Sequence, residues 1–308
     1  MAPTRELAQQ IQRVVMCLSQ YLKVVCYTCV GGTNIAEDKK RLKEGGIQVV
    51  VGTPGRVVDM IGKKFINTDH LKILVLDEAD DMLSRGFIED IKTILGSVPS
   101  DIQVALFSAT MPPEILEMTN QFMRTPIRIL VKNEQLTLDG IKQYYISMDK
   151  EEYKFDTLVE LYKNLTIAQC MIFVNKKERV NELTARLREK NFVVSCIHGE
   201  LDMTEREQTM KEFRTGSSRV LITTDLLGRG IDIQQVNLII NYDLPSKKES
   251  YIHRIGRSGR FGRRGTAINF VTPTDAAFLI ELRKYYNTQI DELPTDLSQI
   301  NKALEKKN

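Results

Sequence analysis

Two carboxylates that follow an apolar run are the strongest candidates for chemistry in this sequence. The run Ile73–Leu76 leads directly into Asp77-Glu78-Ala79-Asp80. A buried strand that ends in this way delivers two carboxylates to one edge of a sheet, where a Mg²⁺ ion that bridges nucleotide phosphates can bind. Asp77 would hold the metal or its water shell, and Glu78 would orient and polarise an attacking water. The structural alternative is an acidic helix start, because Asp and Glu also favour the first turn of a helix.

Two further groups of polar residues have both a functional and a structural interpretation. Five arginines lie close together near the end of the sequence, and such a cluster is usually a solvated basic face: Arg254, Arg257, Arg260, Arg263 and Arg264. The segment Thr53-Pro54-Gly55-Arg56 could contact phosphates, but by turn chemistry alone it is a turn that opens a helix. His70 and His198 lack metal-ligand spacing to another histidine, which favours capping or packing roles.

The cysteines predict free structural thiols. The sequence has five cysteines, and Cys26 and Cys29 form a C-x-x-C pair that could indicate a redox or zinc site. Their surroundings are typical of a β-strand, where residues three apart point to opposite faces, so the two sulfurs cannot share a metal. No second C-x-x-C pair completes a zinc site.

The candidate residues must be positioned by an alternation of strands and helices. Short apolar runs of the kind found in parallel sheets covered on both faces are expected to be strands at Val24–Val30, Gln48–Val51, Ile73–Leu76, Val104–Phe107 and Ile127–Val131. The polar stretch 132–140 predicts a linker. The pattern then restarts, with strands expected at Gln143–Ser147, Cys170–Val174, Val193–Ile197, Val220–Thr223, Leu238–Asn241 and Ala267–Val271.

Amphipathic segments between these runs predict helices, so the fold class is α/β with two consecutive parallel-sheet domains. The predicted domains are residues 1–131 and 141–290, and residues 291–308 form a polar tail that either docks as a short helix or frays. In such sheets ligands bind beyond the carboxyl ends of the strands. Asp77 and Glu78 occupy such a position.

Composition excludes several classes of protein. The 308 residues are 42% hydrophobic and 27% charged, as in an ordinary soluble globular protein. No apolar run reaches the roughly 20 residues that span a bilayer. The first residues form no apolar signal region, which predicts a cytosolic or nuclear location. Because 43 basic residues face 40 acidic ones, any nucleic-acid site must be a local groove.

The order of several short motifs resembles the DEAD-box RNA helicases, and the segments between the motifs are most similar to members of the translation-initiation type. Asp77–Asp80 resembles the second family motif. Six other stretches match further motifs in order: Pro3–Ala8, Gly31-Gly32, Thr53–Arg56, Ser108-Ala109-Thr110, Arg229–Asp232 and His253–Arg260. The resemblance covers nearly the whole chain and implies two tandem RecA-like domains.

The resemblance also implies roles for the matching residues, with ATP and Mg²⁺ as cofactors. Nucleotide chemistry is assigned to Glu78 as the base, Asp77 on Mg²⁺ through water, Arg257 and Arg260 as arginine fingers, and Asp232 on the ribose. Coupling between the domains is assigned to Asp80, Ser108, Thr110, Arg229 and His253. RNA phosphates are assigned to Thr4, Arg5, Gly31, Gly32, Thr53, Gly55, Arg56, Arg206 and Thr224. Glycines let a backbone approach a strand closely, so little base preference is expected.

The sequence departs from the family pattern in one large and two small ways. No G-x-x-x-x-G-K-[ST] loop, which cradles the nucleotide phosphates, occurs in it. The strand before that loop and the upstream glutamine motif are also missing, so we expect a truncated chain whose first domain is incomplete at its N-terminus and exposes a sheet edge. Gly228 stands where the family usually has Ala, and Met203 where relatives often carry Gln.

Three functions remain open at this stage. The leading one is an ATP-dependent RNA helicase that unwinds or clamps single-stranded or duplex RNA in translation initiation, as a monomer with a scaffold protein as partner. The second is a non-catalytic RNA- or scaffold-binding fragment. The third, a DNA helicase of the same superfamily, fits less well because the sequence between the motifs resembles RNA-directed members of the family. The cytoplasm is the expected compartment, with the nucleus as the alternative.

Overall fold

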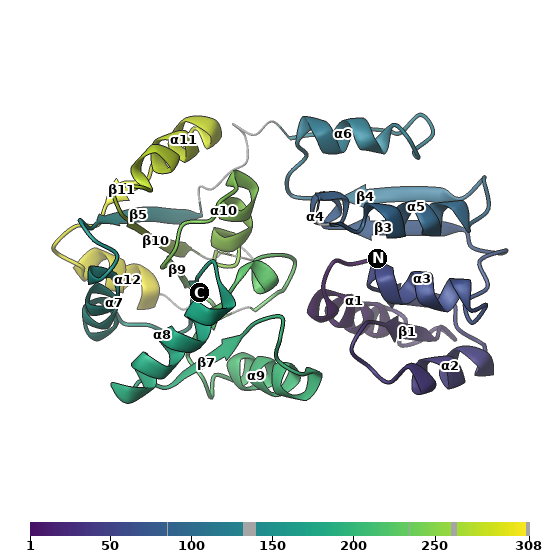
Figure 1. The fold of residues 1–308 in the computed structure, drawn as a ribbon, viewed down its shortest axis with the longest axis horizontal. Helices are drawn as coiled ribbons and strands as arrows, with labels where there is room; N and C mark the ends of the chain where they lie inside the picture. Colours follow the sequence, from purple (N-terminus) through teal and green to yellow (C-terminus); the bar gives the residue numbers. More distant parts are fainter. Residues whose placement is uncertain (85, 132–139, 234, 260–263, 306–308) are drawn as a thin grey trace. The chain divides into compact units, whose positions relative to one another are not determined.

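The computed structural model describes residues 1–84, 86–131, 140–233, 235–259 and 264–305. The chain divides into two compact units, Met1–Leu130 and Val131–Asn308, which Figure 1 shows along the sequence. The predicted first domain ends at residue 131, beside this division. The predicted linker 132–140 lies outside the described residues except for Gly140. Within the described ranges, no helix has the length and apolar character that a membrane span requires.

The first unit alternates helices with short strands. Its helices are α1 (Arg5–Leu18), α2 (Ile35–Glu44), α3 (Pro54–Gly62), α4 (Ala79–Ser84), α5 (Ile88–Gly96) and α6 (Pro113–Thr119). Its strands are β1 (Cys26–Cys29), β2 (Val49–Gly52), β3 (Ile73–Asp77) and β4 (Gln103–Phe107). Local sequence explains two helix starts: Thr4 caps α1 by accepting from Leu7 N–H, and Pro54 occupies the first turn of α3, where its missing N–H costs nothing.

The strands of the first unit form two separate parallel pairs rather than one sheet. β1 pairs with β2, and β3 pairs with β4 so that Asp77 lies opposite Phe107. The backbone of Met1 and Ala2 lies between the pairs: Ala2 N–H donates to Gly52 O (3.0 Å), and Asp77 N–H donates to Met1 O (3.1 Å). The carboxyl ends of β2 and β3 therefore lie on the same side of this unit, as the rule for ligand sites in parallel sheets requires.

The predicted strand Ile127–Val131 is wrong. The structure describes no strand there, and the apolar side chains are exposed, Ile127 at 94% and Ile129 at 90%. Among the residues described in the first unit, β4 pairs only with β3. An extended segment without a neighbouring strand cannot satisfy its backbone hydrogen bonds in a ladder, so high β-propensity alone does not make it a strand.

The second unit contains a longer alternation of the same elements. Its strands are β5 (Ile141–Ser147), β6 (Cys170–Phe173), β7 (Val194–Ile197), β8 (Val220–Thr223), β9 (Leu238–Asn241), β10 (Gly265–Val271) and β11 (Asp291–Glu292). Its helices are α7 (Tyr153–Asn164), α8 (Lys177–Glu189), α9 (Met203–Thr215), the 3₁₀ turn η2 (Asp225–Leu227), α10 (Lys248–Ile255), α11 (Ala276–Tyr286) and α12 (Ser298–Glu305).

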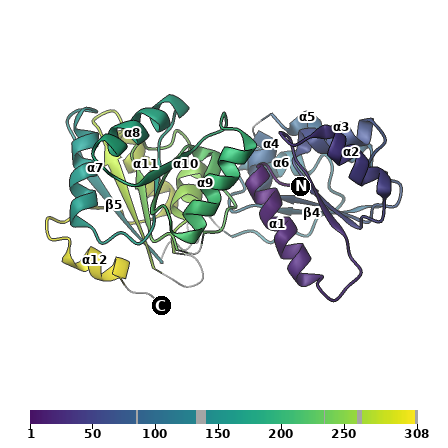
Figure 2. The same cartoon turned by 90° about the horizontal axis from the view of Figure 1, so that it is seen from below.

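These strands form one seven-stranded parallel sheet in the order β11-β5-β10-β9-β6-β8-β7. Alternate residues of β6 point to opposite faces, so Ile172 packs in one core cluster and Phe173 in the other. Residues of α7, α8 and α12 complete the first cluster, whereas residues of α9, α10 and α11 complete the second, and Figure 2 shows these helices around the sheet. Coverage of both faces explains why the central strands are buried along their whole length and mostly apolar.

The segment that the sequence assigned to a polar tail packs on the second unit. β11 pairs with β5 at the edge of the sheet, and α12 buries Ile300 and Leu304 in the core. Ile300 and Leu304 lie four residues apart on one face of the helix and dock it, which favours the docked form over the frayed one. All five cysteines are free, as predicted, and Cys26 and Cys29 are both buried in β1.

Candidate functional site

The predicted acidic pair lies at a sharp turn between β3 and α4. Asp77 is the last residue of β3, and α4 begins at Ala79, so Glu78 makes the whole turn by itself. Glu78 has a φ of +53°, a left-handed conformation that side chains with a Cβ rarely adopt. Its N–H donates to Asp77 Oδ1 (3.0 Å). Strain of this kind persists where surrounding structure imposes it and is common at functional turns.

Asp80 is held by the two hydroxyl residues that follow the neighbouring strand. Ser108 Oγ donates to Asp80 Oδ1 and Thr110 Oγ1 donates to Asp80 Oδ2, both at 2.6 Å. The register explains this contact, because Asp77 lies opposite Phe107 and the residues after both strands must therefore meet. Three residues predicted to couple the domains thus form one hydrogen-bonded group inside the first unit, with both Asp80 oxygens engaged.

Asp77 is a partly buried carboxylate whose ionised form a divalent cation would stabilise. Burial raises the pKa of Asp77, and the hydrogen bond from Glu78 N–H only partly offsets this effect. A desolvated carboxylate oxygen is a preferred Mg²⁺ ligand, and the positive charge of an ion would favour the ionised form. The residues present therefore fit a magnesium site centred on Asp77.

The predicted RNA-contact residues of the first unit gather at the carboxyl ends of β1 and β2. Gly31 N–H donates to Thr53 Oγ1 (3.4 Å), which ties the loop after β1 to the start of α3. Gly32 has a φ of +84°, and a Cβ at this position would lie 2.6 Å from the Arg5 guanidinium. The loop must therefore be glycine here, and Arg5 lies directly against it. Gly55 has no such requirement, since its Cβ would lie 3.6 Å from Asp90.

Arg56, which was predicted to donate to RNA phosphates, has most of its guanidinium engaged inside the first unit. Its side chain is buried and makes an ion pair with Asp38, while Nη1 donates to Thr33 Oγ1 and Nη2 to Thr33 O, both at 3.0 Å. Tyr27 Oη also donates to Asp38 (2.5 Å). Three of its five N–H donors thus hold the loop after Gly32. The phosphate contact assigned to Arg56 stays a prediction.

In the second unit, Thr224, Arg229 and Asp232 lie in the loop that follows β8. Thr224 accepts from Leu226 N–H (3.4 Å) and so caps η2, which carries the chain to Gly228, Arg229 and Asp232. Gly230 has a φ of +64° and makes the turn that separates Arg229 from Asp232. Arg206 belongs to α9, whose start is fixed by a capping box between Asp202 and Glu205.

The predicted arginine fingers follow α10. Arg257 donates from Nη1 to Ile231 O (2.7 Å) and from Nε to His253 O (2.9 Å), so it connects the end of α10 with the loop after β8. His253 lies in the last turn of α10. Arg260 lies outside the described residues. His198 is buried with Nε2 at 3.1 Å from Asn181 Oδ1, whereas His70 is exposed.

Sequence reasoning missed the residue that organises this region. Arg254 has a fully buried side chain whose guanidinium contacts Asp225, Asn241, Asp243 and Asn175. Its place in an arginine cluster suggested a solvated face. A signal was nevertheless available, because Asn175, Asp225 and Asp243 each stand just after an apolar strand, where polar side chains converge in a parallel sheet.

Comparisons with known proteins agree with this geometry. The DEAD/DEAH box helicase family matches residues 1–119, and the helicase conserved C-terminal domain matches residues 153–262. Over 300 residues the chain is 58% identical to eukaryotic initiation factor 4A of Caenorhabditis elegans, covering 97% of this chain and 74% of that protein. It is 57% identical to the ATP-dependent RNA helicase eIF4A of Mycosarcoma maydis, covering 97% and 73%.

Solved structures show the same fold. The chain aligns with S. cerevisiae Dbp5 bound to RNA and ADP BeF3 at a TM-score of 0.92 and 36% identity, covering 99% of this chain and 79% of that one. It aligns with Mss116p bound to ssRNA and AMP-PNP at a TM-score of 0.85 and 27% identity, covering 99% and 66%. The predicted fold class, α/β with tandem RecA-like domains, is confirmed.

Proposed function

Because the chain belongs to the DEAD-box helicase family, a family of ATP-dependent RNA helicases, we propose that it binds RNA and ATP and unwinds or clamps RNA during translation initiation. The observation that carries this proposal is the arrangement around Asp77–Asp80. The acidic turn lies at the carboxyl end of a parallel strand, and the hydroxyls of Ser108 and Thr110 hold Asp80 in place.

In the proposed reaction each residue of the acidic turn has one task. Asp77 would hold Mg²⁺, which supplies charge neutralisation to the nucleotide phosphates when it is bound. Glu78 would position the attacking water and take up its proton. Asp80 keeps the turn in register with the neighbouring strand through its two hydroxyl contacts. Arg257 and Arg260 of the second unit would stabilise negative charge on the transferred group.

We propose that the chain contacts mainly the sugar-phosphate backbone of the RNA rather than its bases. The first unit offers the N-termini of α1 and α3 and the glycine loop at Gly31 and Gly32. Amide groups at helix starts and glycine turns contact phosphates and carry little sequence information. The Dbp5 structure named above contains RNA, which supports RNA as the ligand class.

ATP turnover by the purified chain, with and without a single-stranded oligo(U), tests the enzymatic proposal. We expect turnover that rises with RNA, and Glu78→Gln should lower it by about 100-fold or more, since general base catalysis contributes that much. Glu89→Gln is the matched control, because Glu89 is an exposed residue of α5 whose carboxylate pairs with the nearby exposed Lys92. Equal turnover in wild type and Glu78→Gln would contradict the assigned role.

A second candidate function is a non-catalytic RNA- or scaffold-binding protein. It is favoured by one observation, the lack of a G-x-x-x-x-G-K-[ST] string in the 308 residues. Oligo(U) binding without any RNA-dependent turnover would support this candidate over the first. We further propose that the chain is a monomer with a scaffold protein as partner, and sedimentation of the purified chain tests the monomer. We also propose that it acts in the cytoplasm, with the nucleus as the alternative, and the location of a fluorescent fusion tests this.

A further inference from the structure

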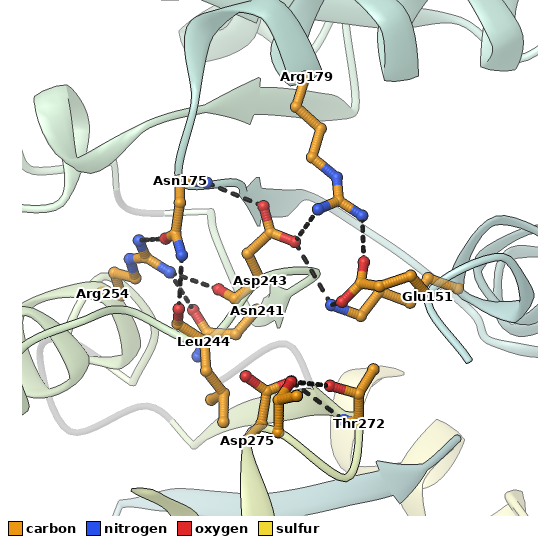
Figure 3. A network of polar contacts seen from close by, with 11 residues as sticks. Glu151, Asn175, Arg179, Asn241, Asp243, Leu244, Arg254, Thr272 and Asp275 are labelled. Atoms are coloured by element: carbon orange, nitrogen blue, oxygen red, sulfur yellow. Dashed lines mark hydrogen bonds and ion pairs between the residues drawn. The ribbon is translucent and has the colours of Figure 1, made fainter. Parts of the chain in front are cut away.

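The centre of the second unit's polar network is one fully buried arginine. Figure 3 shows the Arg254 guanidinium with its contacts to Asn175, Asn241 and Asp243. Nε donates to Asp225 Oδ1 (2.5 Å), Nη2 to Asn175 Oδ1 (2.8 Å), and Nη1 to Asp243 O (2.7 Å) and Asn241 Oδ1 (3.4 Å). A planar guanidinium with its donors in a fixed fork suits such an arrangement, whereas a lysine could reach only part of it.

The acceptors come from the carboxyl ends of three adjacent strands. Asn175 lies two residues after β6, Asp225 two residues after β8, and Asn241 ends β9. In the sheet these strands are neighbours in the order β9-β6-β8. Arg254 therefore fixes the starts of three loops to one another and to α10, its own helix.

Asp225 is the only carboxylate in ion-pair contact with Arg254 among the residues that the structure describes. The other nearby carboxylate, Asp243, is occupied elsewhere: it accepts from Asn175 N–H and pairs with Arg179 (2.9 Å) and with the buried Lys154 (3.4 Å). Figure 3 shows this second part of the network on the side of Asp243 away from Arg254. Loss of the Asp225 charge would thus leave Arg254 buried without a counter-ion.

The loop after β8 is attached to α10 at two points. Near its start, Asp225 pairs with Arg254; near its end, Ile231 O accepts from Arg257. Thr224, which is assigned an RNA phosphate, directly precedes Asp225, and Arg257, which is assigned the nucleotide, lies three residues after Arg254. Because of these two contacts, the loop after β8 and the end of α10 are expected to move together.

We propose that Asp225 and Arg254 are a positioning pair that couples the RNA contact at Thr224 to the arginine segment at the end of α10. This inference rests on the proposed function, because it concerns how the RNA and nucleotide residues of that site act together. Neither residue of the pair needs to contact a ligand. Their role is to transmit a fixed geometry from the loop after β8 to Arg257.

Affinity for RNA distinguishes this role from a simple charge effect. Asp225→Asn removes one negative charge beside the assigned phosphate contact, so electrostatics alone would tighten binding of a labelled oligo(U). If the pair positions Thr224, the substitution should instead weaken oligo(U) binding. We expect a loss of affinity of about tenfold, which corresponds to the loss of one charge-assisted hydrogen bond. Arg254→Lys should act in the same direction, since it keeps the charge but loses the fork.

Arg179→Gln is the matched control. Arg179 belongs to the same network and pairs with Asp243 and Glu151, but it has no contact with the loop after β8 among its described ion pairs. We expect destabilisation without any change in oligo(U) affinity, measured well below the unfolding temperature. Unchanged or tighter RNA binding in Asp225→Asn, or an equal loss in Arg179→Gln, would overturn the proposal.

Hydrogen exchange of the free protein separates failure of this inference from failure of the proposed function. If the wild type does not bind oligo(U), the RNA function fails. The pair is then judged by the amides of Leu226, Gly228 and Ile231, which are hydrogen-bonded within the loop. Asp225→Asn should speed their exchange by about tenfold and Arg179→Gln should not. Unchanged exchange in Asp225→Asn would overturn the positioning role on its own.

Discussion

The two units are built from the same kind of sequence and differ in how completely their strands are covered. In the second unit, β6, β8, β9 and β10 are buried along their whole length. In the first unit, β3 alternates between exposed and buried residues, and Phe107 at the end of β4 is 59% exposed. An apolar parallel strand contributes its full stabilisation only when helices cover both faces and strands flank both edges.

This difference also separates the two candidate sites. In the first unit, the acidic turn and the glycine loop lie at the ends of two small strand pairs linked by the backbone of Met1 and Ala2. In the second unit, one buried arginine holds three strand ends of a continuous sheet together. We therefore expect the second site to keep its geometry under conditions that loosen the first.

The largest expected effect comes from replacing one strand phenylalanine by alanine in each unit. Phe270 in β10 is fully buried, so Phe270→Ala should lower the free energy of unfolding of the second unit by about 3–5 kcal/mol. Phe107→Ala should cost less than about 1 kcal/mol, because most of that side chain is exposed in the folded state. Urea unfolding followed by circular dichroism measures both. Equal losses would show that β4 and β10 are equally covered in solution.

A glycine in the first unit gives the next largest effect. Gly32→Ala places a Cβ in a left-handed conformation and against the Arg5 guanidinium, so we expect a loss of about 1–2 kcal/mol in the stability of the first unit. The loop after β1 should then lose its fixed position, and oligo(U) affinity should fall as well. Gly46→Ala is the control for positive φ without a close neighbour, since nothing lies within 4 Å of its Cβ position.

Two carboxylates predict opposite dependences of stability on pH. Burial raises the pKa of Asp77 above its ordinary value of 3.8, so its ionisation opposes folding, and this penalty disappears as the pH falls below 3.8. Asp77→Asn should therefore stabilise the first unit at pH 7 and have no effect in acid. Thermal unfolding between pH 3 and about 7 measures the change. A loss of stability in this variant at pH 7 would contradict the prediction.

Ionisation of Glu151 in the second unit has the opposite effect and favours folding. Burial alone would raise the pKa of Glu151, but hydrogen bonds from Lys154 and Arg179 outweigh it and lower the pKa below 4.5. Its contribution to stability is present above 4.5 and is lost as the pH falls through the lowered pKa. Glu151→Gln should thus destabilise the second unit at pH 7 and become neutral in acid, in the same pH series of unfolding measurements.

The smallest effect is expected at Gly228. This residue has an ordinary helical φ of −65°, and a Cβ there would lie 3.3 Å from Asp225 O. The entropic gain from removing a glycine and the tight contact oppose each other, so Gly228→Ala should change stability by less than about 0.5 kcal/mol. A much larger loss would show that the loop after β8 needs the space, which would strengthen the role given to Asp225.

How much of the candidate site could be predicted depended on the kind of residue. Asp77 and Glu78 were found because they follow an apolar strand, whose end lies at the edge of a parallel sheet where ligands bind. Asp80, Ser108 and Thr224 were assigned only through the resemblance to the family motifs. Arg56 was assigned to phosphate, yet its guanidinium is turned inward onto Asp38. Both roles suit an arginine at a helix start. The burial of that guanidinium depends on tertiary packing, so the sequence could not predict it.

The sequence by itself determined where strands end and which polar residues follow them, because hydrophobic periodicity is a local property of the chain. Tertiary structure decided which segments found partners. Ile127–Val131 has strong strand propensity and forms no strand, whereas the polar segment after residue 290 docks through β11 and α12. Arg254 meets Asn175 across 79 residues, and Asp80 meets Thr110 across 30. Such contacts depend on strand order and register, which no local pattern specifies.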